Sequence, residues 1–150
     1  MAGRVPFRRP FIFLSMSDPA LSDSAQTVTL TIPGERRFIG IARLFVGGLA
    51  ARLDLGYETM DDLQLALESV LRKAELGPEV TLEAQLDGEG VALLAGPFAA
   101  DPLEATVGQA DSLELERLLA ALVAGTESFT RDDGCWLRLD VRIPAGSGST

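Results

Sequence analysis

The polar side chains whose spacing could support chemistry lie in residues 59–74, TMDDLQLALESVLRKA. Ser69 and Lys73 are four residues apart, and Glu68 and Arg72 repeat that spacing one position earlier. On a helix of 3.6 residues per turn each pair shares a face, and the two pairs are rotated by about 100° from one another. Magnesium requires oxygen ligands, so neither Lys73 nor Arg72 can hold it, although Lys73 could contact a phosphate directly.

The absence of histidine and the presence of one cysteine limit the chemistry further. Without histidine the chain cannot form a Ser-His or Cys-His nucleophile pair, bind zinc through imidazole or take part in a phospho-histidine relay. One cysteine cannot form an intramolecular disulfide, which is compatible with a reducing cytoplasm. Cys135 begins an alternating apolar segment, so we expect a buried structural thiol rather than a reactive one.

The segment that must position these polar residues has the pattern of an amphipathic helix. We expect Thr59 to be its N-cap, with Asp62 in the place of the usual glutamate of a capping box. Its expected core face consists of Leu63, Leu67, Val70 and Ala74.

The rest of the chain predicts a two-layer α+β sandwich. The expected elements are a strand at 27–32, a helix at 35–53, the helix at 59–74, a hairpin of strands at 80–86 and 91–95, a structureless stretch at 96–110, a helix from about 111 to 124, and a hairpin of strands at 126–130 and 135–143. The first helix is expected to bury Phe38, Ile41, Phe45, Leu49 and Leu53, and the last helix Leu115, Leu118, Leu119 and Leu122. Three helices then cover one face of a mixed, mostly antiparallel sheet of about five strands.

Two features of local sequence carry further expectations. Gly47 and Gly48 inside the first helix each cost about 1 kcal/mol relative to alanine, which suggests either close packing against a neighbour or flexibility. Asp87-Gly88-Glu89-Gly90 supplies hairpin-turn chemistry and needs no ligand to explain it.

The chain divides into a flexible leader at 1–25, one domain at 26–144 and a disordered tail at 145–150. The apolar stretch after Arg8-Arg9 stops at Leu14, so the leader is not an export signal, and translation could start at Met1 or Met16. No apolar stretch approaches the roughly 20 residues that a membrane-spanning helix needs. We therefore expect a cytoplasmic protein with no membrane partner.

The net charge of −9 is unevenly distributed. Residues 1–15 contain three arginines and no acidic residue, so the remainder carries 10 basic and 22 acidic residues, a net charge of −12. Such a body repels a phosphate backbone, which disfavours nucleic acid as a partner, and it attracts a basic protein. The alternative is that the acidic surface only confers solubility.

This order of elements resembles the GHKL ATPase-like domain of the anti-sigma-factor serine kinases, across about 27–144. The similarity lies in the first strand followed by Pro33, in Ile41-Ala42-Arg43, in the run DDLQLALESV and in the closing GCWLRLDVRIP. The resemblance implies a glutamate on the 59–74 helix and, four residues later, an asparagine that holds the magnesium of ATP. These positions fall on Ser69 and Lys73, and a slip of one residue would offer Glu68 as the catalytic candidate.

Two further nucleotide-binding positions of the family are altered as well. The aspartate that should contact adenine is absent from Leu94–Phe98, where Ala95, Gly96 and Pro97 are the degenerate cofactor-binding positions. A hydrogen bond to a charged acceptor is worth about 1.5–3 kcal/mol, so this loss alone weakens adenine binding about 10–100-fold. At the start of the third helix, where the family has a glycine-rich lid, Glu114 and Glu116 would face the phosphates.

We therefore expect a degenerate, non-catalytic anti-sigma-like regulator, with no cofactor, that binds a sigma factor or an anti-sigma antagonist. The resemblance places sigma-factor and homodimer contacts on the first helices, which makes Arg36, Arg37, Arg43 and Arg52 candidate contacts. The alternative for these arginines is a solvated helix face. Two other functions remain open: an active serine/threonine kinase that uses ATP and magnesium, and an acidic interaction module or partner subunit unrelated to sigma factors.

Overall fold

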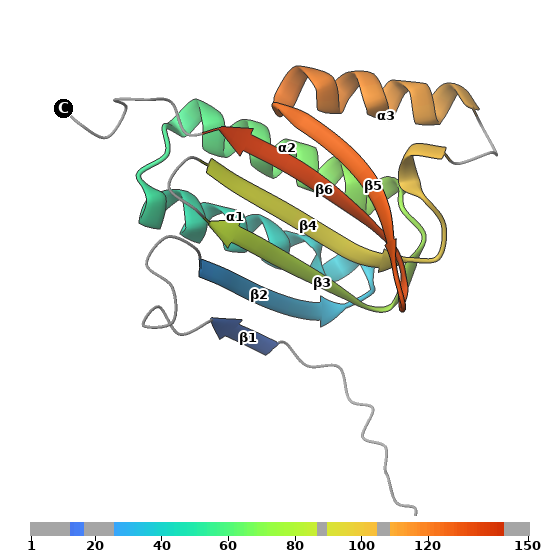
Figure 1. Ribbon diagram of the computed structural model, residues 1–150, viewed down its shortest axis with the longest axis horizontal. Helices are drawn as coiled ribbons and strands as arrows, with labels where there is room; N and C mark the ends of the chain where they lie inside the picture. The colour runs from blue at the N-terminus through green and yellow to red at the C-terminus, as the bar shows by residue number, and fades with distance from the viewer. Residues whose placement is uncertain (1–12, 17–25, 87–89, 105–108, 143–150) are drawn as a thin grey trace, which may run out of the picture.

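A six-stranded sheet runs through the part of the protein that the computed structural model describes, residues 13–16, 26–86, 90–104 and 109–142 (Figure 1). The strands are β1 (Phe13–Met16), β2 (Gln26–Pro33), β3 (Leu76–Leu86), β4 (Gly90–Phe98), β5 (Gly125–Arg131) and β6 (Gly134–Arg142). Their order in the sheet is β1-β2-β3-β4-β6-β5, and each pair of neighbours is antiparallel.

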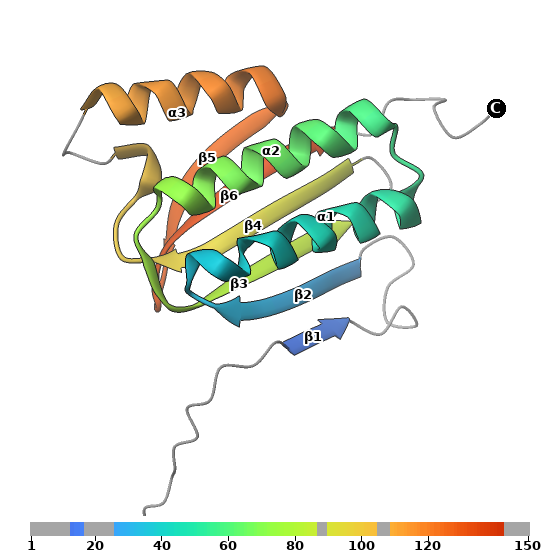
Figure 2. The same ribbon diagram turned by 180° about the vertical axis from the view of Figure 1, so that it is seen from behind.

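The helices lie on one side of this sheet (Figure 2). They are α1 (Ile39–Leu53), α2 (Tyr57–Lys73) and α3 (Gln109–Leu122), with 3-10 turns η2 (Arg36–Phe38) and η3 (Pro102–Glu104). The predicted α+β architecture is confirmed, although the sheet is antiparallel throughout the described strands and not mixed. None of the helices in the described ranges is long and apolar enough to cross a membrane.

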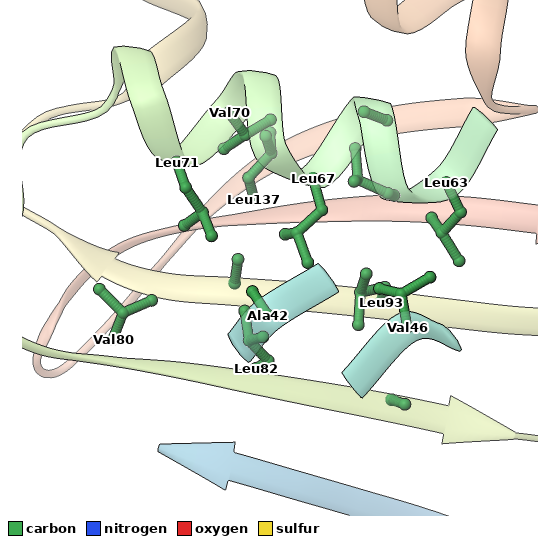
Figure 3. Packing of buried hydrophobic residues seen from close by; sticks show 14 of the residues in the cluster. Ala42, Val46, Leu63, Leu67, Val70, Leu71, Val80, Leu82, Leu93 and Leu137 are labelled. Atoms are coloured by element: carbon green, nitrogen blue, oxygen red, sulfur yellow. The ribbon is translucent and has the colours of Figure 1, made fainter. Parts of the chain in front are cut away.

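The core fills the space between α1, α2 and the sheet. Figure 3 shows side chains of α2 directed at β4 and β6, with α1 alongside. The predicted core face of α2 is confirmed, and Ala66 and Leu71 extend it. The largest of its fully buried side chains are Leu63, Leu67, Leu71 and Val70.

The predicted face of α1 was rotated relative to the observed one. Its buried residues are Ile39, Ala42, Val46, Leu49 and Ala50. Phe38, Ile41, Phe45 and Leu53 are only partly buried, at the margin of the core. The bulky side chains dominated the sequence pattern, whereas the helix turns small residues such as Ala42 toward the sheet and packs closely against it.

The start of α2 also differs from the prediction. The N-cap is Gly56, with no side-chain cap hydrogen bond, so Thr59 lies inside the first turn and forms no capping box. α1 ends at Leu53, its C-cap Asp54 has left-handed dihedral angles (φ 58°, ψ 40°), and Leu55 N donates to the Ala50 carbonyl oxygen at 2.9 Å. This compact helix ending lets α2 begin almost at once.

Several strands are longer or earlier than predicted. β1 lies within the segment predicted to be a leader, and it pairs with β2 from Phe13↔Thr31 to Met16↔Val28. β4 continues through Gly96–Phe98 because it pairs with both β3 and β6, so the predicted loop at 96–110 is shorter and contains η3. The remainder of the leader, the turn at 87–89 and the tail at 145–150 lie outside the described residues.

The sheet face opposite the helices holds a small second cluster that was not predicted. Ala92, Leu94 and Trp136 are buried there, with Phe129 packed against them. The Arg131 guanidinium lies 4.2 Å from the Trp136 ring centroid and pairs with Glu83 at 2.8 Å. Hydrogen bonding to Glu83 raises the pKa of Arg131. Glu83 on β3 therefore pairs with a residue of β5, although β4 and β6 lie between these two strands.

Substitutions at two glycines test how closely the backbone packs at these positions. A side chain at Gly34 would overlap the Gly77 carbonyl oxygen, whereas one at Gly48 meets nothing within 4 Å. We expect Gly34→Ala to destabilise the protein by about 1–3 kcal/mol through overpacking, and Gly48→Ala to stabilise it by up to about 1 kcal/mol through helix propensity. Urea unfolding of both variants measures this; destabilisation by Gly48→Ala would contradict an open face there.

Candidate functional site

The polar residues of the candidate site on α2 point in different directions. Ser69 is half-buried, and Lys73, the last residue of the helix, is exposed. Glu68 faces α1, where its Oε1 accepts from Arg43 Nη1 at 2.9 Å. Its Oε2 accepts from Arg72 Nη2 at 2.8 Å and from Arg72 Nε at 3.1 Å. Both carboxylate oxygens of the slipped catalytic candidate are thus engaged by guanidinium groups.

Two more hydrogen bonds extend this network across the two helices. Arg36 Nη1 donates to the Arg72 carbonyl oxygen at 2.6 Å, and Gln64 Nε2 donates to the Arg43 carbonyl oxygen at 2.9 Å. The pKa of Glu68 is held below its ordinary value of 4.5, mainly by the hydrogen bond from Arg72 and next by that from Arg43. The network therefore favours an ionised Glu68 that fastens α2 to α1.

The second position that the resemblance assigns to nucleotide binding lies on β4 and belongs to the packed sheet. Ala95 is 2% exposed and is part of the main core, between Leu82 of β3 and Leu137 of β6. A methyl group added at Gly96 would lie 2.7 Å from Trp136 Cδ2 and 2.9 Å from the Cys135 carbonyl oxygen. The neighbouring Trp136 ring thus accounts for a glycine at this position without a ligand.

The remaining residues that the resemblance assigns to the nucleotide site differ in exposure. Pro97 is half-buried at the end of β4, while Glu114 and Glu116 are exposed on α3. Within the described residues no three Asp, Glu or Cys side chains are placed to hold a metal ion. At the positions that the resemblance assigns to the metal and to adenine, Lys73 supplies an ammonium group and Ala95 a core methyl group, and neither is an oxygen ligand.

The four candidate contact arginines are not one cluster. Arg36, Arg37 and Arg43 lie on η2 and the first half of α1, whereas Arg52 lies in its last turn, about 13 Å of helix rise beyond Arg43. Arg37 pairs with the exposed Glu35 at 2.8 Å. Sequence reasoning missed Arg72 as their neighbour, although its spacing of four from Glu68 indicated a pair along one helix face.

Cys135 is half-buried rather than fully buried. It pairs with Phe98 of β4 and Thr130 of β5, close to the hairpin end of β6. Asp101 was not singled out from the sequence, yet its Oδ1 accepts from Leu103 N at 2.9 Å and from Ser128 Oγ at 2.7 Å. This carboxylate joins η3 to β5 and is occupied structurally.

Removing the charge of Glu68 tests the interhelical network. We expect Glu68→Gln to lower the free energy of unfolding at neutral pH by about 1 kcal/mol, a modest value because both arginines are substantially exposed. The pKa of Glu68 is lowered by folding, so this stabilisation is present above pH 4.5 and is lost as the pH falls through the folded-state pKa. Urea unfolding at pH 7 and at pH 3 measures both effects. A difference between wild type and variant that grows toward acid pH would contradict the ion pairs.

Gly96 offers a separate test of why the β4 position is a glycine. We expect Gly96→Ala to destabilise the protein by about 1–3 kcal/mol, because the new methyl group would collide with the Trp136 ring. We expect Gly96→Ala to cost less stability in a Trp136→Leu background than in the wild type. Additive losses in this double-mutant cycle would contradict the packing explanation.

Comparison with known proteins finds similarity to two curated serine-protein kinases named RsbW. The chain is 29% identical over 141 residues to that of Bacillus velezensis, with 87% of this chain and 85% of the kinase covered. A shorter stretch of 42 residues is 36% identical to that of Halalkalibacterium halodurans, covering 28% of this chain and 26% of that protein. No family model matches the chain.

Proposed function

Since this chain is a relative of the anti-sigma-factor serine kinases of the GHKL type, we propose that it is a non-catalytic regulator that acts by binding another protein. The observation that carries the proposal is the direction of Glu68. Its two carboxylate oxygens accept three hydrogen bonds from Arg43 and Arg72, so this side chain serves the contact between α1 and α2.

Two of the positions that the resemblance assigns to nucleotide binding support the proposal independently. Ser69 and Lys73 replace the glutamate and asparagine that the resemblance implies, and Lys73 cannot ligate magnesium. Ala95 stands where an acceptor for adenine is expected, and its side chain is within the main core. Burying a carboxylate there would cost several kcal/mol without a partner. The fold thus fills this position with apolar packing.

The partner that we propose is a sigma factor or an anti-sigma antagonist, as the resemblance implies. Arg36, Arg37 and Arg43 are the contact candidates that lie together, and Arg52 would contribute only to an interface that extends along all of α1. This assignment rests on the resemblance and on the exposure of the arginines. The single chain offers no support for a homodimer.

The competing function is an active serine kinase, which the names of both relatives favour. For Glu68 to act as the base in that case, it would have to leave Arg43 and Arg72 and turn away from α1. The structural cost would be the loss of the hydrogen bonds that lower its pKa. ATP and magnesium would be required as cofactors only under this alternative.

Titration with Mg-ATP separates the two functions. We expect no heat of binding and no rise in melting temperature at millimolar Mg-ATP, because metal and adenine ligands are both missing. The serine-protein kinase RsbW of Bacillus velezensis, measured in parallel, is the matched control. Magnesium-dependent binding by this chain would overturn the non-catalytic proposal and favour the kinase.

Pull-down from the native host then tests the partner. Recovery of a sigma factor or an anti-sigma antagonist with wild type, and its loss with Arg36→Glu/Arg43→Glu, is the expected result. Specific recovery of an unrelated protein would contradict the proposed partner and favour a general interaction module.

A further inference from the structure

The last strand of the sheet, β5, has one free edge. Its seven residues pair with β6, and within the described ranges no strand lies on its other side. Figures 1 and 2 both show β5 at the margin of the sheet, close to the end of α3. A free edge presents backbone N–H and C=O groups to which an extended chain can add as a further strand.

An apolar groove adjoins the beginning of this edge. It has a volume of about 470 Å³ and lies between α3, η3 and β5. Its lining includes the fully buried Leu119, the partly buried Leu103 and Val123, and Leu113, which is 54% exposed. An apolar side chain brought along β5 would therefore gain burial and would cover the exposed part of Leu113.

The two faces of β5 differ in what they offer an added strand. Phe129 packs with Trp136 on the face opposite the helices, and Glu127 is exposed on that same face. Because side chains alternate along a strand, Thr126 points to the helical side, where it lines the groove. An added strand alternates in the same way. Every second side chain would face the groove, and the others would lie on the side of Glu127.

The acidic charge of the protein is concentrated around this edge. Residues 99–133, which connect β4 to β6, contain eight acidic and two basic residues, a net charge of −6 out of −9 for the whole chain. Glu116 lines the groove, and Glu127 lies on β5 itself. Of the two basic residues, Arg131 is paired with Glu83. Such a surface attracts cationic side chains and disfavours acidic ones.

We propose that the free edge of β5 and its groove bind an extended segment of a partner protein in which apolar and basic residues alternate. The segment pairs with β5 as a further strand, with its apolar side chains toward the groove and its basic side chains on the side of Glu127. This inference rests on the proposed protein-binding function and gives the partner a defined chemistry. It also assigns to one edge of the sheet the basic partner that the acidic composition predicted.

A second copy of this chain fits the edge less well than such a partner. A symmetric contact would place β5 of one copy against β5 of the other, and the same net negative charge would then lie on both sides. Like charges placed opposite each other repel. The chain's own residues 1–12 contain three arginines and no acidic residue. They are the second competing occupant, and the experiments separate them from a partner.

A labelled ten-residue peptide of alternating valine and lysine is the probe for this inference. Fluorescence anisotropy at physiological ionic strength measures its binding to the full chain. One control peptide has glutamate in place of lysine, and another has the same composition with the valines and the lysines in separate blocks. We expect the probe to bind about tenfold more tightly than either control, because it alone combines alternation with positive charge. No binding of the probe at millimolar concentration would overturn the proposal.

Two exposed leucines provide matched variants for the groove. Leu113→Gln removes an apolar side chain at the groove, whereas Leu44→Gln makes the same change on α1, where Leu44 is 74% exposed. We expect Leu113→Gln to weaken binding of the probe about fivefold, and Leu44→Gln less than about twofold, since the peptide buries only Leu113. Circular dichroism verifies that both variants are folded. Equal weakening would overturn the groove as the binding site.

Paired glutamates test the contribution of charge in the same assay. Glu116→Gln/Glu127→Gln removes two acidic groups beside the groove and the edge. Glu58→Gln/Glu79→Gln removes the same charge from exposed positions on α2 and β3. We expect the first variant to weaken binding about fivefold and the second less than about twofold. Equal weakening would show an effect of net charge alone and would contradict a local site.

Amide hydrogen exchange distinguishes strand addition from contact through side chains alone. We expect the probe to slow exchange within Gly125–Arg131, because edge amides of β5 become hydrogen-bonded. Exchange in β1, at the opposite edge of the sheet, should not change. Binding without added protection of β5 would overturn the added strand.

Sedimentation and a shortened chain test the two competing occupants. We expect wild type to sediment as a monomer. Self-association that Leu113→Gln abolishes would assign the edge to a second copy, and tighter binding of the probe after deletion of residues 1–12 would assign it to that segment. Either result would overturn the partner proposal. The probe reports on β5 whether or not Mg-ATP binds, so failure of this inference is distinguishable from failure of the proposed function.

Discussion

Burial of the apolar stripe of α2 against the centre of the sheet is the constraint on which the other features depend. Ala66 and Leu67 are at most 1% exposed, and the stripe covers the region where β4 lies between β3 and β6. A helix has a fixed angle between successive residues, so burying Leu67 and Val70 also fixes the directions of Glu68 and Ser69. Glu68 consequently faces α1, so the packing of α2 on the sheet determines which hydrogen bonds Glu68 forms.

The central strand β4 is constrained on both of its faces. Ala95 points into the core beneath the helices, and its neighbour Gly96 leaves room for Trp136 on the opposite face. In a strand, adjacent residues necessarily face opposite sides. Packing on the two faces of the strand therefore accounts for Ala95 and Gly96, the residues that the family resemblance assigns to nucleotide binding.

The sequence predicted most of the fold because its strands and helices have different periods. Leu137, Leu139 and Val141 alternate on β6 and are buried as expected. The buried face of α1 was predicted wrongly because large apolar residues such as Phe38 and Phe45 were given more weight than Ala42. In a tight contact between helix and sheet the small Ala42 is the buried residue. The network at Glu68 was harder to foresee, because Arg43 lies 25 residues away and meets it only after the helices pack.

Strand β1 protects one edge of the sheet. It covers the outer edge of β2, whose backbone would otherwise present unpaired N–H and C=O groups along that side. A variant that lacked Phe13–Ser15 would lose three of the four residues of that cover. Exposed strand edges are templates for pairing between molecules. Such a variant would thus keep the same helices and core but would associate more readily through its sheet.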